Sequence, residues 1–363
     1  MLVSLFRFDD DSGVAVPCGY VDDFTSLVFT RSYSGIGSWQ MTISLSSQNI
    51  PFILEADIVH LRDRVTGMIT KYTRSISEGN ETLSVSGIEL KGLVRGRIVM
   101  PPSNAAYVTY TNLSPTVIIH GLLSSQIFSA NDTDRLIYGT STFEADSRSL
   151  SYNGRFSSLE EDIEAMAETY GIGYSATINP ENNIRWDVYH GKNRTDSQSD
   201  NSKMIFSYNL DNMDSSELEI ATTNTNVLLV AGQGEGTQRA TCLVGSGSGF
   251  RRFEAFVDAR DVDDSSLLPE RGNEKLSEYG DSTVFSARAP THLNSRYGID
   301  FDLGDVCTIR DSLLSIDARI TEITECYEDG DTTLDITFGY DKSGLDDILG
   351  RIKKSTDGLK RKE

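Results

Sequence analysis

The stretch Trp39–Leu45, WQMTISL, alternates apolar and polar side chains without a break. Successive side chains of a β-strand point to opposite faces, so the tryptophan, methionine, isoleucine and leucine share one face. One apolar and one polar face is typical of a strand in an antiparallel sheet that covers a core. We therefore predict a half-buried strand here, in a fold built mainly from β-structure.

The sequence on the C-terminal side of this stretch repeats the pattern. Asp57–Arg62 continues through Asp63-Arg64 into Val65–Ser77, which predicts a hairpin with long arms, and Thr82–Ile88 alternates again. Several short antiparallel strands at this spacing are typical of a small barrel or sandwich, architectures that leave few strand edges open. We expect one such domain over residues 1–103.

The character of the sequence changes at Pro101–Asn104. Ser114 followed by Pro115 predicts a helix start, with serine as the N-cap and proline in the first turn. Ser158, followed by acidic residues, predicts a second helix that ends at Gly171. Strands are predicted over 173–178 and 184–189. We therefore expect a separate α+β domain over residues 104–204.

Strand patterns return after residue 205. Ser216–Thr222 alternates, Val227–Ala231 is continuously apolar, and three more strands are predicted over 305–310, 318–326 and 332–338. The last two are joined by Glu328–Asp331, which contains the hairpin signal Asp-Gly. Between these strands, residues 258–281 hold eight acids against three bases. The fold class is therefore α+β and mainly β, with β blocks at both ends of the chain.

The charge of the chain excludes several functions. Its 363 residues have a mass of 40.0 kDa and suit two or three domains; 33 Lys and Arg stand against 54 Asp and Glu, a net charge of −21. Affinity for nucleic acid rests largely on cationic side chains, and an anionic membrane repels acidic proteins. DNA-binding enzymes are therefore disfavoured. Residues 350–363 differ, because they carry +4 and leave −25 on the remainder.

The sequence shows no secretory signal and no apolar stretch long enough to span a bilayer, so we expect no membrane insertion. Its four cysteines, Cys18, Cys242, Cys307 and Cys326, lie far apart and form no CxxC pair. This spacing fits neither a disulfide framework nor a zinc site. We interpret them as reduced, mostly buried thiols of a protein made in a cytoplasm.

No motif predicts a metal or cofactor site. The four histidines, His60, His120, His190 and His292, lack metal-ligand spacing. Gly245–Gly249 has glycine where a nucleophile elbow needs serine, and Gly232–Gly236 has neither dinucleotide-loop nor P-loop spacing. Both are interpreted as loops. The acidic turns at Asp9–Gly13 and Asp329–Asp331 do not match a calcium loop. We therefore predict no catalytic, cofactor-binding or metal-binding residues.

Acidic pairs are the one catalytic feature that sequence alone leaves open, because glycan cleavage needs only two carboxylates. Candidate acids occur on the second predicted helix and in the acidic stretch. In a chain with 54 acids such pairs arise by chance. The acids considered are Glu160, Glu161, Asp162, Glu164, Asp261, Asp263 and Asp264.

Several segments resemble a known family. Asp23–Trp39 is similar to the opening of siphophage tail hub proteins, and the similarity continues in Ile58–Ile69 and Leu83–Arg97. It resumes at Leu159–Gly173, Val257–Asp261 and Ile299–Asp305, and spans about residues 20–345 in all. The chain therefore resembles the siphovirus tail proteins related to the baseplate hubs of contractile-tailed phages.

This resemblance implies an architecture and partners. It implies two related antiparallel β-barrel domains that assemble as a homotrimer into a pseudo-sixfold ring. The barrels would be residues 1–103 and, together, 205–245 and 298–349; the α+β domain 104–204, an acidic helical or loop insertion 246–297 and a basic tail 350–363 would complete the chain.

Such a hub would be a non-enzymatic virion protein at the tail tip or baseplate, made in the cytoplasm of the bacterial host. It would join the tail tube to the host-recognition tip and let the genome leave. Its partners would be the distal tail or tube protein, the tape measure, and a tip or receptor-binding protein, with DNA passing through unbound. We expect no C-terminal hydrolase extension of the kind that many relatives bear.

Two alternatives remain at this point. The 15 tyrosines and many polar loops also fit a surface protein that binds glycans or a receptor. A peptidoglycan hydrolase with two acidic residues is the other alternative. Acidity would suit a DNA conduit, because negative walls repel phosphate. The basic tail fits equally a helix that docks on a partner and a solvated end.

Overall fold

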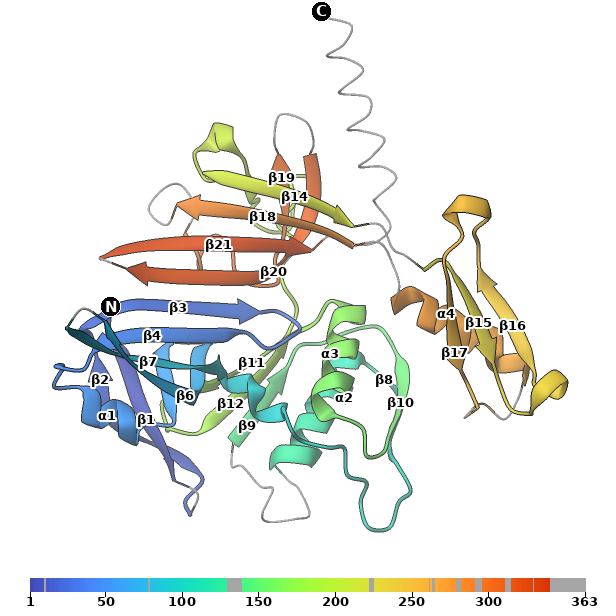
Figure 1. Ribbon diagram of the computed structural model, residues 1–363, viewed down its shortest axis with the longest axis horizontal. Coiled ribbons are helices and arrows are strands. Elements are labelled where there is room, and N and C mark those ends of the chain that lie inside the picture. Colours follow the sequence, from blue (N-terminus) through green and yellow to red (C-terminus); the bar gives the residue numbers. More distant parts are fainter. Residues whose placement is uncertain are drawn as a thin grey trace, which may run out of the picture. The chain divides into compact units, whose positions relative to one another are not determined.

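The computed structural model describes most of the chain, which folds into two compact units (Figure 1). Unit 1 comprises Met1–Ser215, Ala287–Asp311 and Asp317–Phe338, and unit 2 comprises Ser216–Ser286, Ser312–Ile316 and Gly339–Glu363. The described residues are 1–9, 11–77, 79–128, 139–221, 225–260, 262, 265–278, 282–290, 296–310, 315–328 and 330–339. The predicted basic tail at 350–363, His292 and the acids Asp261, Asp263 and Asp264 lie outside the described residues.

Unit 1 begins with seven antiparallel strands and a short helix, α1 (Ile50–Glu55). The predicted strand at Trp39–Leu45 is β4, and the predicted long-armed hairpin is β5–β6. In the sheet these strands follow the order β3-β4-β7-β6-β5-β1-β2. Their bounds are β1 Val3–Asp9, β2 Val14–Val21, β3 Phe24–Ser32, β4 Ser38–Ser44, β5 Ile58–Arg62, β6 Val65–Ser77 and β7 Asn80–Glu89.

The apolar side chains on one face of this sheet form a single hydrophobic cluster. Trp39, Met41 and Ile43 of β4 are buried there with Val85 of β7 and Ile53 of α1, and strands β1, β2, β3, β5 and β6 also contribute. Side chains from all seven consecutive strands thus pack together on one face of the sheet. The alternation read from the sequence therefore marks the inward face of the sheet.

The C-terminal β block joins the same sheet. Residues Glu322–Glu328 of β20 (Ser315–Glu328) pair antiparallel with Ser26–Ser32 of β3, and β21 (Asp331–Gly339) lies on the other side of β20. β19 (Val306–Arg310) pairs with β20 and, in parallel, with β13 (Ile205–Phe206). In the part of the chain that the structure describes, no sheet closes into a barrel, so the expectation of two barrels is not confirmed.

The middle of the chain folds as predicted into helices and strands. Ser114 caps α2 (Pro115–Leu123) by accepting a bond from the Val117 N–H, and Ser158 caps α3 (Leu159–Tyr170) in the same way through Glu161. Gly171 ends α3 in the left-handed conformation. The sheets are β11-β12-β9 and β10-β8, with bounds β8 Val108–Leu113, β9 Gly139–Phe143, β10 Leu150–Gly154, β11 Gly173–Ile178 and β12 Ile184–Tyr189.

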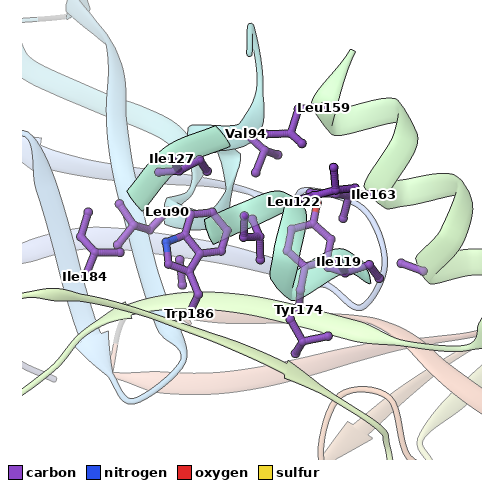
Figure 2. Close-up of a cluster of buried hydrophobic side chains, with 14 of the residues drawn as sticks. Leu90, Val94, Ile119, Leu122, Ile127, Leu159, Ile163, Tyr174, Ile184 and Trp186 are labelled. Atoms are coloured by element: carbon purple, nitrogen blue, oxygen red, sulfur yellow. The ribbon is translucent and has the colours of Figure 1, made fainter. Parts of the chain in front are cut away.

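A second hydrophobic cluster lies around these two helices (Figure 2). Trp186 of β12 and Tyr174 of β11 pack there with side chains of α2 and α3, such as Leu122 and Ile163. Leu90 comes from the 3₁₀ helix η1 (Leu90–Val94), which follows β7 directly. Phe6, Ala15, Ile58 and Val99 also belong to this cluster, which a π-helical turn, η2 (Ser124–Phe128), extends. The core of the α+β segment is therefore shared with the first 103 residues.

Unit 2 has a small core of its own. β15 (Val227–Ala231) lies between β16 (Thr241–Gly245), antiparallel to it, and β17 (Glu254–Asp258), parallel to it. The helix α4 (Leu268–Glu278) packs against β15 and β16. The expected domain boundary at 245/246 falls inside this sheet, and the domain boundaries stay a prediction.

The remaining elements are β14 Ser215–Ala221, β18 Ser282–Pro290, η4 Tyr208–Leu210, η5 Gly236–Gln238, η6 Gly249–Arg251 and η7 Ser265–Leu267.

Among the described helices, none is both long enough and apolar enough to cross a membrane.

Candidate functional site

A connected polar group in unit 1, which we call the Arg–Tyr junction, is centred on the buried side chains of Arg31, Tyr33 and Tyr189. It also contains the half-buried residues Tyr297, Asp302 and Arg319. Arg31 on β3 is only 3% exposed. Its guanidinium donates hydrogen bonds to the Tyr297 hydroxyl and, over 3.2 Å, to Asp302 Oδ1. These contacts join β3 to the loop 296–305, which lies about 270 residues away in the sequence.

Tyr33 extends the junction to the α+β segment. Its hydroxyl donates to the Gly171 carbonyl at 3.0 Å and accepts from the Gly191 N–H at 2.9 Å. Its ring meets Tyr189 edge-on, with centroids 5.6 Å apart, and the Arg319 guanidinium lies 5.3 Å from its centroid. Arg319 also donates to the Gly304 carbonyl at 2.6 Å. One tyrosine therefore holds three separate segments of unit 1 together.

Two glycines make room for the Tyr33 ring. A Cβ atom at Gly173 would lie 2.2 Å from a ring carbon, and one at Gly304 would lie 2.1 Å from a ring carbon. Carbon atoms do not approach so closely without a shift of backbone or ring. Gly304 also has a φ of 93°, a conformation that other residues rarely adopt. The close packing of β11 and the loop 296–305 against β3 thus depends on these glycines.

Burial and neighbouring groups move the pKa values of Arg31, Tyr189 and Tyr297 further from neutral pH. Burial raises the pKa of both Tyr189 and Tyr297, so their hydroxyls stay protonated. Burial alone would lower the pKa of Arg31. The combined electrostatic attraction of Tyr297 and Asp302 is larger than this effect and holds the pKa well above its ordinary value. A general acid or base works best with a pKa near the working pH. These groups therefore suit a permanent bond between segments rather than proton transfer.

A second buried ionic group lies at the junction of β3, β7 and η1. Glu89 Oε2 accepts from the N–H groups of Ser32 at 3.1 Å and Gly37 at 2.7 Å, and it lies 3.4 Å from Lys91 Nζ. Lys91, 1% exposed, also donates to the carbonyls of Ser32 at 2.5 Å and Tyr174 at 3.1 Å. Burial lowers the pKa of Lys91, while Glu89 opposes this effect.

Two further ion pairs hold the C-terminal segment. Arg62 at the end of β5 donates to Glu325 of β20 at 2.6 Å, and Arg194 donates to Asp305 at 2.5 Å. Glu325, Arg194 and Asp305 are all buried. In every case one partner comes from the first 200 residues and the other from beyond residue 300. The C-terminal strands are thus attached by charge-assisted bonds as well as by the β3–β20 ladder.

The histidines singled out from the sequence have local contacts. His60 lies in β5 with Nδ1 2.8 Å from the Thr66 hydroxyl, and His120 lies in α2 against the Phe143 ring. His190 Nε2 lies 3.4 Å from Asp146 Oδ2. Within the described ranges, no three His, Cys, Asp or Glu side chains come together in a way that could hold a metal ion.

The acids on α3 are engaged at the start of that helix. Arg95 donates to Glu160 at 2.9 Å, and Asp162 accepts from the hydroxyls of Tyr152 at 2.6 Å and Ser157 at 2.5 Å. Burial raises the pKa of Glu164, and nearby acids add to the shift. These bonds tie α3 to the segments before it.

The structure also shows the surroundings of the glycine-rich stretches and of the cysteines. Gly245–Gly249 leads from the end of β16 into η6, and Gly232–Gly236 leads from β15 into η5, both as loops with left-handed glycines. The four cysteines are free thiols; Cys307 is buried and the other three are half-buried. Burial raises the pKa of Cys307, with Asp305 adding to the shift.

Sequence reasoning did not find the Arg–Tyr junction. Arg31 and Tyr33 follow an alternating strand pattern, in which a charged side chain is expected on the solvent-exposed face. No local sequence signal connects them to Tyr297 or Asp302. The only sequence hint is the run Thr30–Gly35, part of the segment that carries the family resemblance.

Comparison with solved structures places the fold among phage tail proteins. The 43 kDa tail protein of prophage MuSo2 from Shewanella oneidensis aligns with a TM-score of 0.57 at 12% identity, covering 93% of this chain and 97% of that one. A tail protein from Neisseria meningitidis MC58 aligns with a TM-score of 0.55 at 12% identity, covering 95% and 97%. Prophage tail protein gp18 from Listeria monocytogenes EGD-e aligns with a TM-score of 0.51 at 12% identity, covering 97% and 98%.

Sequence comparison agrees with this result. None of the curated proteins matches the sequence. The family model described as Siphovirus ReqiPepy6 Gp37-like protein matches residues 18–340, which is most of the chain. The resemblance to siphovirus tail proteins seen in the sequence is thereby confirmed. The chain belongs to the Siphovirus ReqiPepy6 Gp37-like protein family.

Proposed function

We propose that this protein is a structural component of a phage tail, a homotrimeric hub at the tail tip or baseplate. The observation that carries the proposal is the fold, which three phage tail proteins share over more than 90% of their length and of this chain. The family match over residues 18–340 supports it independently. The hub would connect the tail tube to the host-recognition tip and let the genome leave through its centre.

The bonds within unit 1 suit a protein that transmits force. Segments far apart in the sequence are joined by the β3–β20 ladder, by the buried pair Arg194–Asp305, and by the pairs Arg31–Asp302 and Arg62–Glu325, in each of which one partner is buried. A tail component must transmit force during attachment and ejection without coming apart. Buried charged pairs are costly to separate, because each leaves an unpaired charge. This pattern suits a structural part better than an enzyme, so we propose that the protein is non-enzymatic.

A strand edge offers a surface for assembly. β5 pairs with β6 only as far as Met68, and in the described residues no strand pairs with the outer edge of Lys71–Ser77. All residues of that half-strand are exposed, including Ile76 at 61%. Open strand edges invite pairing with another chain, and a closed ring needs such a head-to-tail contact. We propose that this edge contacts the neighbouring copy.

The outer face of the N-terminal sheet would suit the wall of a conduit. Much of it carries short hydroxyl and amide side chains. Lys71 of β6, paired with Ser86, and Val28 of β3, paired with Gln40, lie among them, so this face offers DNA few cations to bind and limited apolar surface to adhere to. The hydroxyl and amide side chains are Thr73 and Ser75 of β6, Thr82, Ser84 and Ser86 of β7, and Gln40, Thr42 and Ser44 of β4. The partners would be the distal tail or tube protein, the tape measure, and a tip or receptor-binding protein.

The test is the mass and shape of the purified full-length protein. Light scattering after size exclusion is expected to give three times the chain mass of 40.0 kDa, and electron microscopy a threefold ring with a hole. Ile76→Lys should shift the protein to monomer with an unchanged far-ultraviolet circular dichroism spectrum, since the side chain is exposed. Tyr107→Lys, 50% exposed and outside the strands, is the matched control.

A protein that stays monomeric at high concentration, both alone and with purified tail tubes, would refute the trimer. Glycan-array binding by that monomer would favour a receptor-binding role instead. Clearing in a cell-wall zymogram would contradict the non-enzymatic assignment.

A further inference from the structure

The sheet of unit 2 carries an exposed row of three large apolar side chains, which we call the apolar row. Leu229 on β15 is paired directly with Leu243 on β16 and with Phe256 on β17. Paired residues of neighbouring strands point to the same face, so the three side chains stand side by side. Their exposed fractions are 39%, 61% and 56%. The row crosses all three strands of the sheet.

The core of unit 2 lies on the opposite face. Leu228, Val230 and Val244 alternate with the row residues and are buried with Leu268 at the start of α4. A Cβ atom at Gly272 of α4 would lie 2.7 Å from methyl carbons of Val230 and Val244, so the helix already packs as closely as it can. The apolar row is therefore not needed for this core. In the alternating pattern of a half-buried sheet, polar residues are expected in its place.

Charged groups border the row. Arg239 pairs with Asp258 at 2.5 Å and its guanidinium lies 5.6 Å from the Phe256 ring centroid, while Arg252 pairs with Glu254 at 2.5 Å. Residues 216–286, which include this sheet, hold twelve acids and six bases. An apolar centre with a charged, net acidic border fits an amphipathic partner with basic flanks.

The sequence beyond β21 has that chemistry. Leu345, Ile348, Leu349 and Ile352 follow the spacing i, i+3, i+4, i+7, which predicts a helix with one apolar face. Residues 350–363 carry six bases against two acids. The apolar pattern thus complements the apolar row, and the basic C-terminal flank complements its border, while Asp346 and Asp347 lie between the apolar positions.

We propose that the chain's own C-terminal segment, Leu345–Ile352, docks through its apolar face on the apolar row of unit 2. Five residues separate the segment from the end of β21 at Gly339. The basic residues that follow then lie against an acidic unit. This inference is independent of the tail role proposed above.

Photo-crosslinking of the full-length protein tests the proposal. Benzoylphenylalanine replaces Leu243, the most exposed residue of the row, and mass spectrometry maps the crosslinks at low micromolar protein. We expect crosslinks to peptides containing residues 345–352 in the band of single-chain mass. Phe250, which is 96% exposed in η6 and outside the row, is the matched control position and should give none.

A second variant tests the apolar face of the segment itself. Ile348→Asp with Ile352→Asp should abolish the Leu243 crosslink, because the two substitutions place charges on the apolar face of the segment. Crosslinks only between two chains, crosslinks to the sheet of a second copy, or equal crosslinking from positions 243 and 250 would each overturn the proposal.

Discussion

At the scale of single residues, the features that matter most are charges buried where three segments meet. Lys91 donates to two carbonyls from different strands and lies 3.4 Å from Glu89. Removing one member of such a group leaves the others unsatisfied in a low-dielectric interior, which costs far more than losing a surface ion pair. The buried group therefore fixes how β3, η1 and β11 lie together.

Replacing Lys91 by methionine is expected to lower the free energy of unfolding by about 3–5 kcal/mol, the usual cost of breaking a buried ion pair. Urea denaturation followed by tryptophan fluorescence measures it, because Trp39 and Trp186 are both buried in unit 1. Lys203→Met is the matched control, since the exposed Lys203–Asp196 pair contributes at most about 1 kcal/mol. Equal effects of the two substitutions would contradict the role given to Lys91.

His60 predicts a pH dependence of stability. Burial lowers its pKa in the folded state, with Asp63 partly opposing this effect, so the unfolded chain binds the proton more readily. Stability is therefore full above the unfolded pKa of about 6.5 and falls as the pH drops below it. We expect the melting temperature to decrease from pH 7.5 to 5.5, and less so in His60→Asn. An unchanged pH profile in that variant would show that other groups set the dependence.

At the scale of elements, the N-terminal sheet depends on close contact between neighbouring strands around Trp39. The indole lies across two glycines: a Cβ atom at Gly67 would be 2.3 Å from Trp39 Nε1, and one at Gly87 would be 2.9 Å away. At Gly87 the added carbon would also lie 1.8 Å from the Met68 carbonyl oxygen. The strands β4, β6 and β7 can thus approach as they do only because these positions lack side chains.

Gly87→Ala is accordingly expected to destabilise unit 1 by at least about 1–3 kcal/mol, the cost of overpacking a closely packed region. The neighbouring substitution Ser86→Ala, on the outer face of the same strand, should change stability by less than about 0.5 kcal/mol. Tryptophan fluorescence during urea denaturation compares the two. A Gly87→Ala variant as stable as Ser86→Ala would mean that the backbone can shift to accommodate the methyl group.

At the scale of the whole molecule, the two units have separate cores. Unit 2 is held by a small cluster built around Leu228, Val230, Val244, Ala259 and Leu268, whereas the described residues of unit 1 form large clusters that include both tryptophans. A chain with independent cores need not unfold in one step. Calorimetry is therefore expected to show two transitions, with the smaller one belonging to unit 2.

Leu228→Ala should lower only the unit 2 transition, by about 2–5 kcal/mol for a buried leucine truncated to alanine. The urea midpoint seen by tryptophan fluorescence should stay unchanged, because both tryptophans report on unit 1. Leu267→Ala, at a half-exposed position of the same unit, serves as the control. A parallel fall of both transitions would show that the two units unfold together.

The local structure of this protein was predictable because its signals are local. Strand alternation at Trp39–Leu45, the caps Ser114 and Ser158, and the left-handed Gly171 depend on neighbours within a few residues. The predicted strands at 173–178 and 184–189 agree with β11 and β12 for the same reason. The net charge of −21 likewise follows from the composition without any knowledge of the fold.

The joining of distant segments was not predictable in this way. The β3–β20 ladder, the core shared by the first 103 residues and the α+β segment, and the contacts of Arg31 with Tyr297 and Asp302 connect residues far apart in sequence. Such pairings depend on which edges and faces meet after folding, and periodicity carries no such information. The sequence by itself thus determined the elements, while only the tertiary structure decided which elements share a sheet, a core and a buried charge.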